Sequence, residues 1–179
     1  MTLALLSNED INSMALCFIS IGSNIDKDIN IPSSLHALQQ LFGNLLISSV
    51  YQSRAVGFEG EDFYNLIVGF NTDLDVNSVS QRLREIELNH GRCRNSKKFS
   101  ARTLDLDLVL YDDLILNDGR LQIPRAEIED YAFVLEPLAE IAPGLRHPIN
   151  HRTYAEIWES FDKSLINQEK VVPEWLKSI

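Results

Sequence analysis

The sequence lacks most of the features that assign a chain to a specialised class of protein. Its two cysteines, Cys17 and Cys93, form no CxxC pair, so we expect two reduced thiols in a reducing compartment. No apolar run reaches the ~18 residues that suggest a membrane span. The N-terminal segment has neither the basic region nor the long apolar run of a signal peptide. These absences predict a cytoplasmic protein with no membrane partner.

Common enzyme motifs are missing as well. The chain has no GxxxxGK[ST] phosphate loop, no glycine loop of the protein kinases, no HExxH and no GxSxG. Its four histidines lack the spacing of metal ligands. His147 and His151 are four residues apart, but Pro148 between them disfavours a helix. A zinc site and a nucleophilic hydrolase are therefore disfavoured.

The length of 179 residues predicts one domain with a substantial core. We expect a core over residues 16–160, with terminal extensions at 1–14 and 162–179. The net charge of −10 disfavours nucleic acid as a partner, although a local basic patch could override it. We expect a monomer and leave a dimer open.

Hydrophobic periodicity predicts the order β-α-β-β-α-β, followed by a hairpin and two helices. This order is typical of an α+β protein with a ferredoxin-like split βαβ sheet (βαββαβ) and added elements. Pro32 suits the start of the first helix, Gly43 its end, and Asp75 the N-cap of the second. The expected strands are 16–22, 45–53, 63–70 and 103–111; the expected helices are 32–43, 75–91, 131–143 and 153–161; the hairpin is 114–123, around Asp118-Gly119.

Two aspartates stand inside the leucine-rich strand TLDLDLVLY. Alternation puts the leucines from Leu104 to Leu110 on the core face, and Asp105 and Asp107 together on the opposite face. Residues i and i+2 of a strand are about 6.5–7 Å apart, so the two carboxylates can bracket divalent cations. Mg²⁺ in particular takes one or two protein carboxylates together with substrate phosphates. The alternative is a solvated outer face of the sheet.

A basic segment leads into this strand. Residues 92–102 hold five of the 16 basic residues of an acidic chain. Cations beside a carboxylate pair suit a polyphosphate, because metal ions neutralise bridging oxygens and guanidinium groups hold the remainder. The alternative is a solubilising loop. Glu87 precedes the segment and either orients one of these cations or is a solvent-facing helix acid.

The strand 63–70 offers a place for a flat ring. Phe63 and Asn65 share one face, so a heterocycle could stack on the ring and bond to the amide. The alternative is a purely structural pair. The opposite face carries Tyr64, Leu66, Val68 and Phe70.

Taken together, these segments resemble a known family. The run IELNHGRCR…FSARTLDLDLVLY is similar to the signature of the 6-hydroxymethyl-7,8-dihydropterin pyrophosphokinases of folate biosynthesis. The motif RTLDLD at 102–107 is the specific part, and the resemblance spans roughly residues 16–160. Supporting segments stand in the expected order: ISIGSN at 19–24, YQS at 51–53, DFYN at 62–65 and FVLEPLAEIAP at 133–143.

The resemblance implies transfer of a pyrophosphoryl group from ATP to the hydroxymethyl oxygen of the pterin, with release of AMP. It implies that Asp105 and Asp107 hold two Mg²⁺ ions and that Arg92 and Arg102 close over the phosphates. The resemblance implies that Glu87 sets the conformation of the basic segment and that Phe99 seals the site. The full set of residues that it places on the nucleotide side is Glu87, Arg94, Lys98, Phe99, Arg120 and Arg125. The pterin positions are Ser53, Val56, Phe63, Asn65 and Phe133, with the ring between Phe63 and Phe133.

The segment PRAEIEDYAFVL departs from the family pattern. Arg125 stands where a histidine is expected, Ala126 replaces the next residue, and Tyr131 stands where the family has an arginine. Arg54 replaces a typical proline. These changes keep open a paralogue that binds pterin or nucleotide with weak or altered activity. An acidic ferredoxin-like interaction domain is a third hypothesis, disfavoured as a nucleic-acid module by the net charge.

Overall fold

The computed structural model describes residues 14–55, 60–91 and 102–178. Within these ranges an antiparallel sheet has the strand order β5-β1-β4-β3-β8, and β2 also pairs with β4. This arrangement confirms the ferredoxin-like prediction, because the strand β1 lies between β4 and β5. The sheet strands are β1 (Ala15–Ser23), β2 (Leu46–Ile47), β3 (Val50–Ser53), β4 (Phe63–Thr72), β5 (Asp105–Tyr111) and β8 (Gln168–Val171); the hairpin is β6 (Leu116–Asn117) and β7 (Gln122–Ile123).

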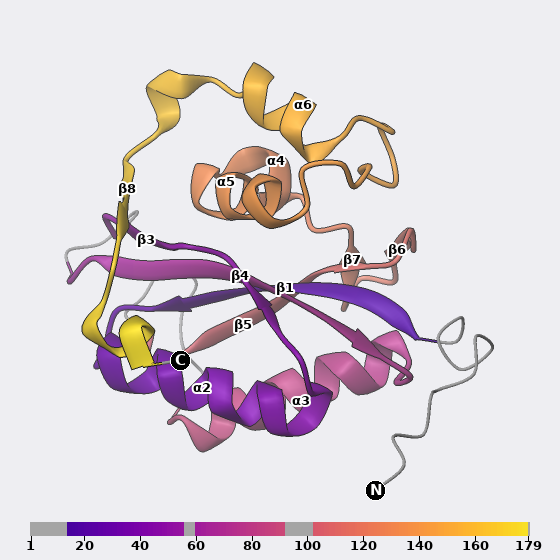
Figure 1. Cartoon of the computed structure of the whole chain (residues 1–179). Helices are drawn as coiled ribbons and strands as arrows, with labels where there is room; N and C mark the ends of the chain where they lie inside the picture. Colours follow the sequence, from indigo (N-terminus) through magenta and orange to yellow (C-terminus); the bar gives the residue numbers. More distant parts are fainter. Residues whose placement is uncertain (1–13, 56–59, 92–101, 179) are drawn as a thin grey trace, which may run out of the picture.

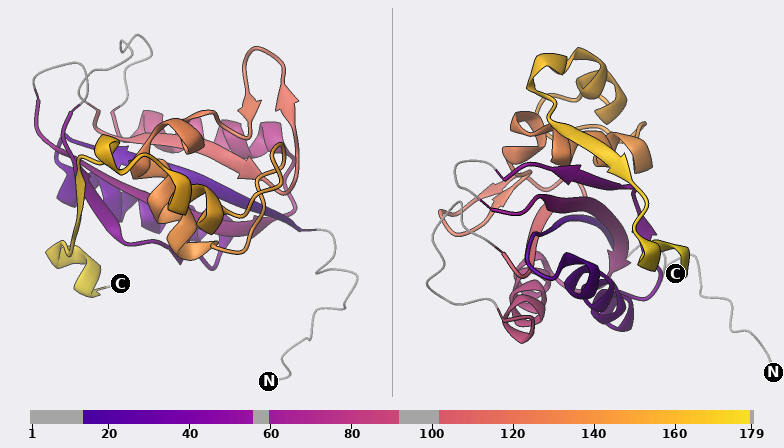
Figure 2. Two further views of the ribbon diagram at one scale, coloured as in Figure 1. Left: turned by 90° about the horizontal axis from the view of Figure 1, so that it is seen from above. Right: turned by 90° about the vertical axis from the view of Figure 1, so that its left-hand side faces the viewer.

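Helices cover both faces of the sheet (Figures 1 and 2). The lower layer in Figure 1 holds α2 (Lys27–Phe42) and α3 (Val76–Asn89). The upper layer holds α4 (Glu127–Asp130), α5 (Ala132–Ile141) and α6 (Tyr154–Ser160). Two 3-10 turns, η1 (Lys163–Leu165) and η2 (Glu174–Ser178), flank β8. None of the helices in the described ranges is long and apolar enough to cross a membrane.

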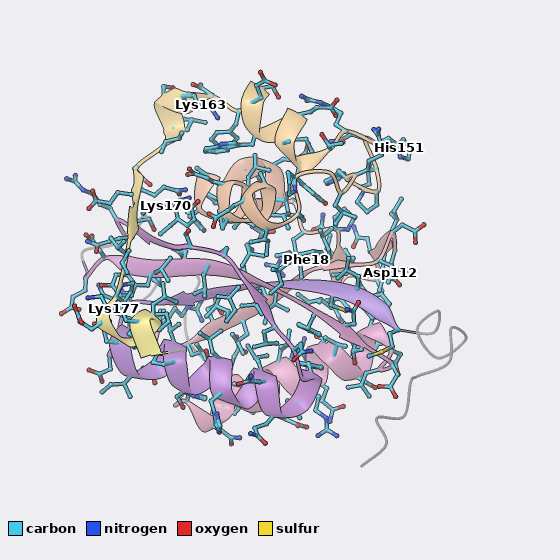
Figure 3. The ribbon with its side chains drawn as sticks, viewed as in Figure 1. Phe18, Asp112, His151, Lys163, Lys170 and Lys177 are labelled. Carbon is cyan, nitrogen blue, oxygen red and sulfur yellow. The ribbon has the colours of Figure 1, made fainter. Side chains whose placement is uncertain are left out.

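Each face of the sheet has its own apolar core. The lower core joins β1, β4 and β5 to α2 and α3, and includes Leu66, Val68 and Phe70. The upper core joins the same strands to α4, α5 and α6, and includes Phe18, which Figure 3 labels between the two layers. Phe18 lies opposite Gly69, where an added Cβ would come within 2.8 Å of the Phe18 ring. Glycine at this position is therefore what lets the ring lie flat on the sheet.

A β-bulge corrects the expected face of one leucine. In the pairing with β1, Ile19 lies opposite Leu108 but Phe18 lies opposite Leu110, so Val109 is an extra residue. The extra residue reverses the alternation of side chains beyond it. Leu108 belongs to the lower core as predicted, but Leu110 belongs to the upper core. The prediction that all four leucines share one face is therefore wrong for Leu110.

Two predicted elements also differ in extent from those in the structure. The first helix begins at Lys27 rather than Pro32, which lies inside it. The predicted strand 45–53 is two strands separated at Ser48 and Ser49. The Ser48 hydroxyl accepts a hydrogen bond from the N–H of Ile67, so a side chain replaces a regular ladder contact there. By contrast, α3 starts as predicted, because the Asp75 carboxylate accepts hydrogen bonds from two N–H groups of its first turn.

The C-terminal segment contributes a strand that the sequence analysis did not predict. β8 pairs antiparallel with β3, and Figure 1 shows it running along the sheet edge from the upper layer to the lower one. After β8, Trp175 packs against the lower core, and its indole Nε1 donates to Asp28 Oδ1 on α2 at 3.1 Å. The segment thus contacts both layers.

Glu140 links α5 to the strands β3 and β8. Its carboxylate accepts hydrogen bonds from the Tyr51 hydroxyl at 2.7 Å and from both the hydroxyl and the N–H of Ser49. Lys170 of β8, labelled in Figure 3, lies 3.1 Å away. Burial alone would raise the pKa of Glu140, but these donors outweigh burial and lower its pKa. The ionised carboxylate therefore stabilises the folded state.

We predict that Glu140→Gln lowers stability at neutral pH by about 1–3 kcal/mol, the usual loss for hydrogen bonds to a charged group. The native pKa is lowered, so the stabilisation is complete above the unfolded value of about 4.3 and disappears as pH falls through the native pKa. The difference between the urea midpoints of wild type and variant should therefore be smaller at pH 3 than at pH 7.

The matched control is Glu159→Gln, at an exposed glutamate of α6, which should leave the midpoint unchanged at both pH values. A constant difference between wild type and Glu140→Gln from pH 7 to pH 3 would contradict a role for the ionised carboxylate.

Candidate active site

The predicted metal and ring residues lie in one row across the sheet, on the face that α5 covers. Gly22 of β1 is opposite Asp105 of β5 on one side and opposite Asn65 of β4 on the other. Neighbouring strands are about 4.8 Å apart, which places the Cα atoms of Asp105 and Asn65 about 10 Å apart. Asp107 is on the same face, opposite Ser20. One strand therefore separates the carboxylate pair from the ring residues.

Gly22 forms the floor between the two groups. A Cβ at this position would lie 3.4 Å from Asn65 Oδ1 and 3.9 Å from Phe63 Cδ1, so both atoms border the space that the missing side chain leaves. The contact distances are ordinary, and the fold itself does not demand glycine here. The missing side chain instead leaves space beside Asn65 Oδ1.

The ring residues occupy the face predicted for them. Phe63 and Asn65 lie on the α5 side, whereas Leu66, Val68 and Phe70 belong to the lower core. Asn65 is buried, and its Nδ2 donates to the hydroxyl of Ser53, its neighbour on β3, at 2.8 Å. This hydrogen bond fixes the amide between Ser53 and the Gly22 floor.

Phe133 belongs to the first turn of α5, in the layer above the sheet. It is half-buried against the upper core, and its ring stacks on that of Tyr131 with centroids 5.0 Å apart and planes 19° apart. Tyr131 stands where the resemblance leads us to expect an arginine. In this chain the position therefore supports an aromatic ring rather than supplying a charge.

Arg125 approaches the carboxylate pair from the segment after the hairpin. Its Nη1 lies 3.4 Å from Asp107 Oδ1, and its Nη2 lies 2.9 Å from Glu127 Oε1. The backbone N–H of Arg125 donates to the carbonyl of Val109, the bulged residue of β5. Burial alone would lower the pKa of Arg125, but Asp107, Glu127 and Asp105 outweigh burial and raise its pKa. The guanidinium is therefore a permanent charge beside Asp107.

Glu87 is not the solvent-facing helix acid that the sequence left open. Its side chain is 3% exposed, and its Oε1 accepts a hydrogen bond from the N–H of Leu106 at 2.7 Å. Leu106 stands between Asp105 and Asp107 on an outer strand of the sheet. Glu87 thus fixes the backbone that carries both carboxylates.

Asn24 is a site-forming residue that the sequence analysis did not single out. Its Oδ1 accepts from the N–H of Arg102, its own N–H donates to the Arg102 carbonyl, and its Nδ2 donates to the Glu61 carbonyl. The buried Ser23 hydroxyl donates to the Thr103 carbonyl at 2.6 Å. The sequence GSN at the end of the first strand could have indicated these contacts, because it places the short polar side chains of Ser23 and Asn24 where the strand ends.

The other predicted site residues are distributed as follows. Arg102 lies beside the end of β1, held through its backbone by Asn24. Arg120 is exposed in the turn of the β6–β7 hairpin, where its N–H donates to Asp118 Oδ1. Five predicted residues lie outside the described ranges: Val56, Arg92, Arg94, Lys98 and Phe99.

Comparison with known proteins identifies the family. The model of the 7,8-dihydro-6-hydroxymethylpterin-pyrophosphokinase family matches residues 18–143. The chain belongs to this family. A 2-amino-4-hydroxy-6-hydroxymethyldihydropteridine pyrophosphokinase of Haemophilus influenzae is 33% identical over 152 residues, which cover 83% of this chain and 94% of that protein. A pyrophosphokinase of the same name from Aquifex aeolicus is 30% identical over 145 residues, covering 80% and 90% respectively.

Solved structures agree on the fold of this pyrophosphokinase-family chain. Wild-type Plasmodium falciparum HPPK-DHPS with pteroate matches with a TM-score of 0.70 and 13% identity over 88% of this chain. An HPPK-DHPS in complex with substrates matches with a TM-score of 0.69 and 12% identity. The chain spans about half the length of these longer proteins, 46% and 47%. At such identities the similarity supports the fold alone.

The donor set at β5 fits Mg²⁺. Asp105 and Asp107 are half-buried, share a face and offer hard oxygen ligands. Within the described ranges no group of three or more His, Cys, Asp or Glu side chains is arranged to hold a metal ion. A two-carboxylate site suits an ion that takes its remaining ligands from phosphate and water.

We predict that Arg125→Met strengthens binding of Mn²⁺, used as a probe for Mg²⁺, in the absence of nucleotide. The guanidinium repels a cation at Asp107, and charges a few ångströms apart near a surface interact by about 1–4 kcal/mol. We expect about tenfold tighter Mn²⁺ binding, measured by electron paramagnetic resonance. Arg82→Met, on the exposed surface of α3, is the matched control. Equal or weaker Mn²⁺ binding by Arg125→Met would contradict the proximity of the two charges.

We also predict that Gly22→Val blocks the ring site without unfolding the protein. Valine suits a strand, but its methyl groups would enter the space beside Asn65 and Phe63. Calorimetric titration with 6-hydroxymethylpterin should show at least about tenfold weaker binding, and the circular dichroism spectrum should be unchanged. Undiminished pterin binding would place the ring elsewhere.

Proposed function

We propose that this chain transfers the pyrophosphoryl group of ATP to 6-hydroxymethyl-7,8-dihydropterin in a Mg²⁺-dependent reaction of folate biosynthesis. The observation that carries the proposal is the cross-strand row of Asp105, Gly22 and Asn65. It supports the proposal because the carboxylate pair and the proposed ring residues stand at adjacent positions on one face of the sheet. Family membership supplies the reaction class.

In the proposed complex, Phe63 and Phe133 sandwich the pterin and Asn65 bonds to its edge. The aromatic faces favour a flat ring, and the buried amide discriminates against rings that lack matching donors and acceptors. The hydroxymethyl group is then directed over Gly22 toward β5. The chain thereby holds the acceptor oxygen beside the triphosphate, and positioning is the main requirement of phosphoryl transfer.

In the proposed reaction the pterin hydroxyl oxygen forms a bond to the β-phosphorus of ATP. The bond between that phosphorus and the oxygen bridging to the α-phosphate breaks, AMP departs with the bridging oxygen, and the hydroxyl proton passes to solvent. Asp105 and Asp107 would hold Mg²⁺, with two ions expected. When bound, the metal neutralises charge on the phosphates. Arg125 and Arg102 would contact phosphate oxygens, and Arg92 would join them from the basic segment.

Arg125 retains a positive charge where the family pattern has a histidine, and its guanidinium suits bidentate contact with phosphate. Nothing in the comparisons favours the alternative of a weakly active paralogue. The partners in this proposal are therefore ATP and the hydroxymethyl-dihydropterin. A cytoplasmic location and a monomeric state stay predictions from the sequence.

The direct test is formation of AMP and pterin diphosphate from ATP, Mg²⁺ and the dihydropterin, followed by chromatography. Asp105→Asn and Asp107→Asn should each lower turnover at least about 100-fold, as removal of a single charge-stabilising group does in other enzymes. Both variants should fold, because the two side chains lie off the lower core. The matched control is Asp113→Asn, at an exposed aspartate just after β5, and it should remain fully active.

Two outcomes would contradict the proposal. One is a wild-type protein that binds neither 6-hydroxymethylpterin nor ATP in calorimetry. The other is turnover that persists in excess EDTA or in both aspartate variants.

A further inference from the structure

Gln168 connects two elements that carry proposed ring residues, β3 and α5, although it comes from the C-terminal segment. It is the first residue of β8 and lies opposite Ser53 of β3, so both side chains are on the α5 side of the sheet. From there its amide reaches the first turn of α5, where Nε2 donates to the Ala132 carbonyl at 3.2 Å and to Glu136 Oε2 at 2.7 Å.

These two contacts determine the orientation of the Gln168 amide. Both partners are acceptors, so only the NH₂ group can face them, and a flipped amide would place its oxygen against two acceptor oxygens. The remaining atom, Oε1, is buried and has no hydrogen-bond partner among the residues that the structure describes. A buried amide oxygen without a donor is uncommon and costs about 1–3 kcal/mol.

Gln168 lies next to neighbours of the residues proposed to hold the ring. Ser53 accepts the hydrogen bond from Asn65, and Ala132 immediately precedes Phe133. Phe133 is restrained on one side by stacking with Tyr131. Gln168 restrains the same turn of α5 from the sheet edge through its Nε2, and its Oε1 is left as an unsatisfied acceptor. An unpaired buried polar atom lowers the stability of the folded chain. Natural proteins retain such unfavourable local features mainly at functional sites.

We propose that Gln168 is a positioning and specificity residue for the ring substrate. Its Nε2 holds the turn that carries Phe133, and its Oε1 accepts a hydrogen bond from an N–H group of the bound ring. A 2-amino-4-oxo pteridine offers such donors along its edge. This inference rests on the proposed function and adds a binding residue outside the segments that carry the family resemblance.

The test uses Gln168→Met, which keeps the length of the side chain and removes both polar atoms. We expect about tenfold weaker binding of 6-hydroxymethylpterin in calorimetry and an increased KM for the dihydropterin with kcat nearly unchanged. Binding of a non-hydrolysable ATP analogue should stay within about twofold of wild type. The melting temperature without ligand should not fall, because loss of the two hydrogen bonds is offset by removal of the unpaired oxygen.

The matched control is Glu169→Gln, on the next residue of β8, whose exposed side chain lies on the opposite face. It should leave pterin affinity unchanged. A structural role alone would give the reverse pattern in Gln168→Met, with a lower melting temperature and wild-type pterin affinity, and that result would overturn the inference. Absence of pterin binding by the wild-type protein would instead overturn the proposed function.

A second measurement needs no variant. In ¹⁵N-labelled wild-type protein, the side-chain amide resonances of Gln168 should shift when 6-hydroxymethylpterin is added, because a new bond at Oε1 polarises the amide. They should not shift with the ATP analogue alone. A Gln168 signal that stays in place while pterin binds would also overturn the inference.

Discussion

The position of β1 between β4 and β5 is the constraint on which the site depends. Because β1 is paired on both sides, its register fixes Gly22 opposite Asp105 and Asn65 at once. A one-residue slip in either ladder would move the carboxylates or the ring residues to the other face. Two apolar cores hold the register, since both faces of β1 are buried. The packing that stabilises the fold therefore also fixes the relative positions of Asp105, Gly22 and Asn65.

The bulge at Val109 solves a second problem of the same strand. Before the bulge, β5 must present Asp105 and Asp107 to the site; beyond it, the same face must present Leu110 to the helices of the upper layer. The extra residue reverses the alternation of side chains, so the same face can carry the aspartates before the bulge and Leu110 after it. It also gives Arg125 a backbone acceptor, the Val109 carbonyl, close to Asp107. A local irregularity therefore serves both the upper core and the charge balance of the site.

The features that could be predicted from the sequence are those that depend on residues close together in the chain. The faces of β4, the Asp75 cap and the placement of Asp105 and Asp107 follow from alternation and capping, and the family followed from the motif RTLDLD. The phase change at Leu110 was missed because apolar residues on either side of the bulge give no signal of it. β8 was missed because its sequence, QEKV, is charged and its partner Ser53 is distant in the chain. The contacts of Gln168 and Asn24 likewise depend on tertiary structure.

The two outer strands of the sheet differ from the usual unprotected edge, where free N–H and C=O groups invite pairing with another chain. On β5 the buried Glu87 carboxylate occupies the N–H of Leu106. On the other side β8 covers β3, and its own exposed Glu169 and Lys170, followed by Pro173, make it a poor template for a further strand. Residues that shape the site thus also protect the sheet from aggregation. Shortening the chain before β8 would therefore expose β3 to self-association and also remove the contacts of Gln168 with the first turn of α5.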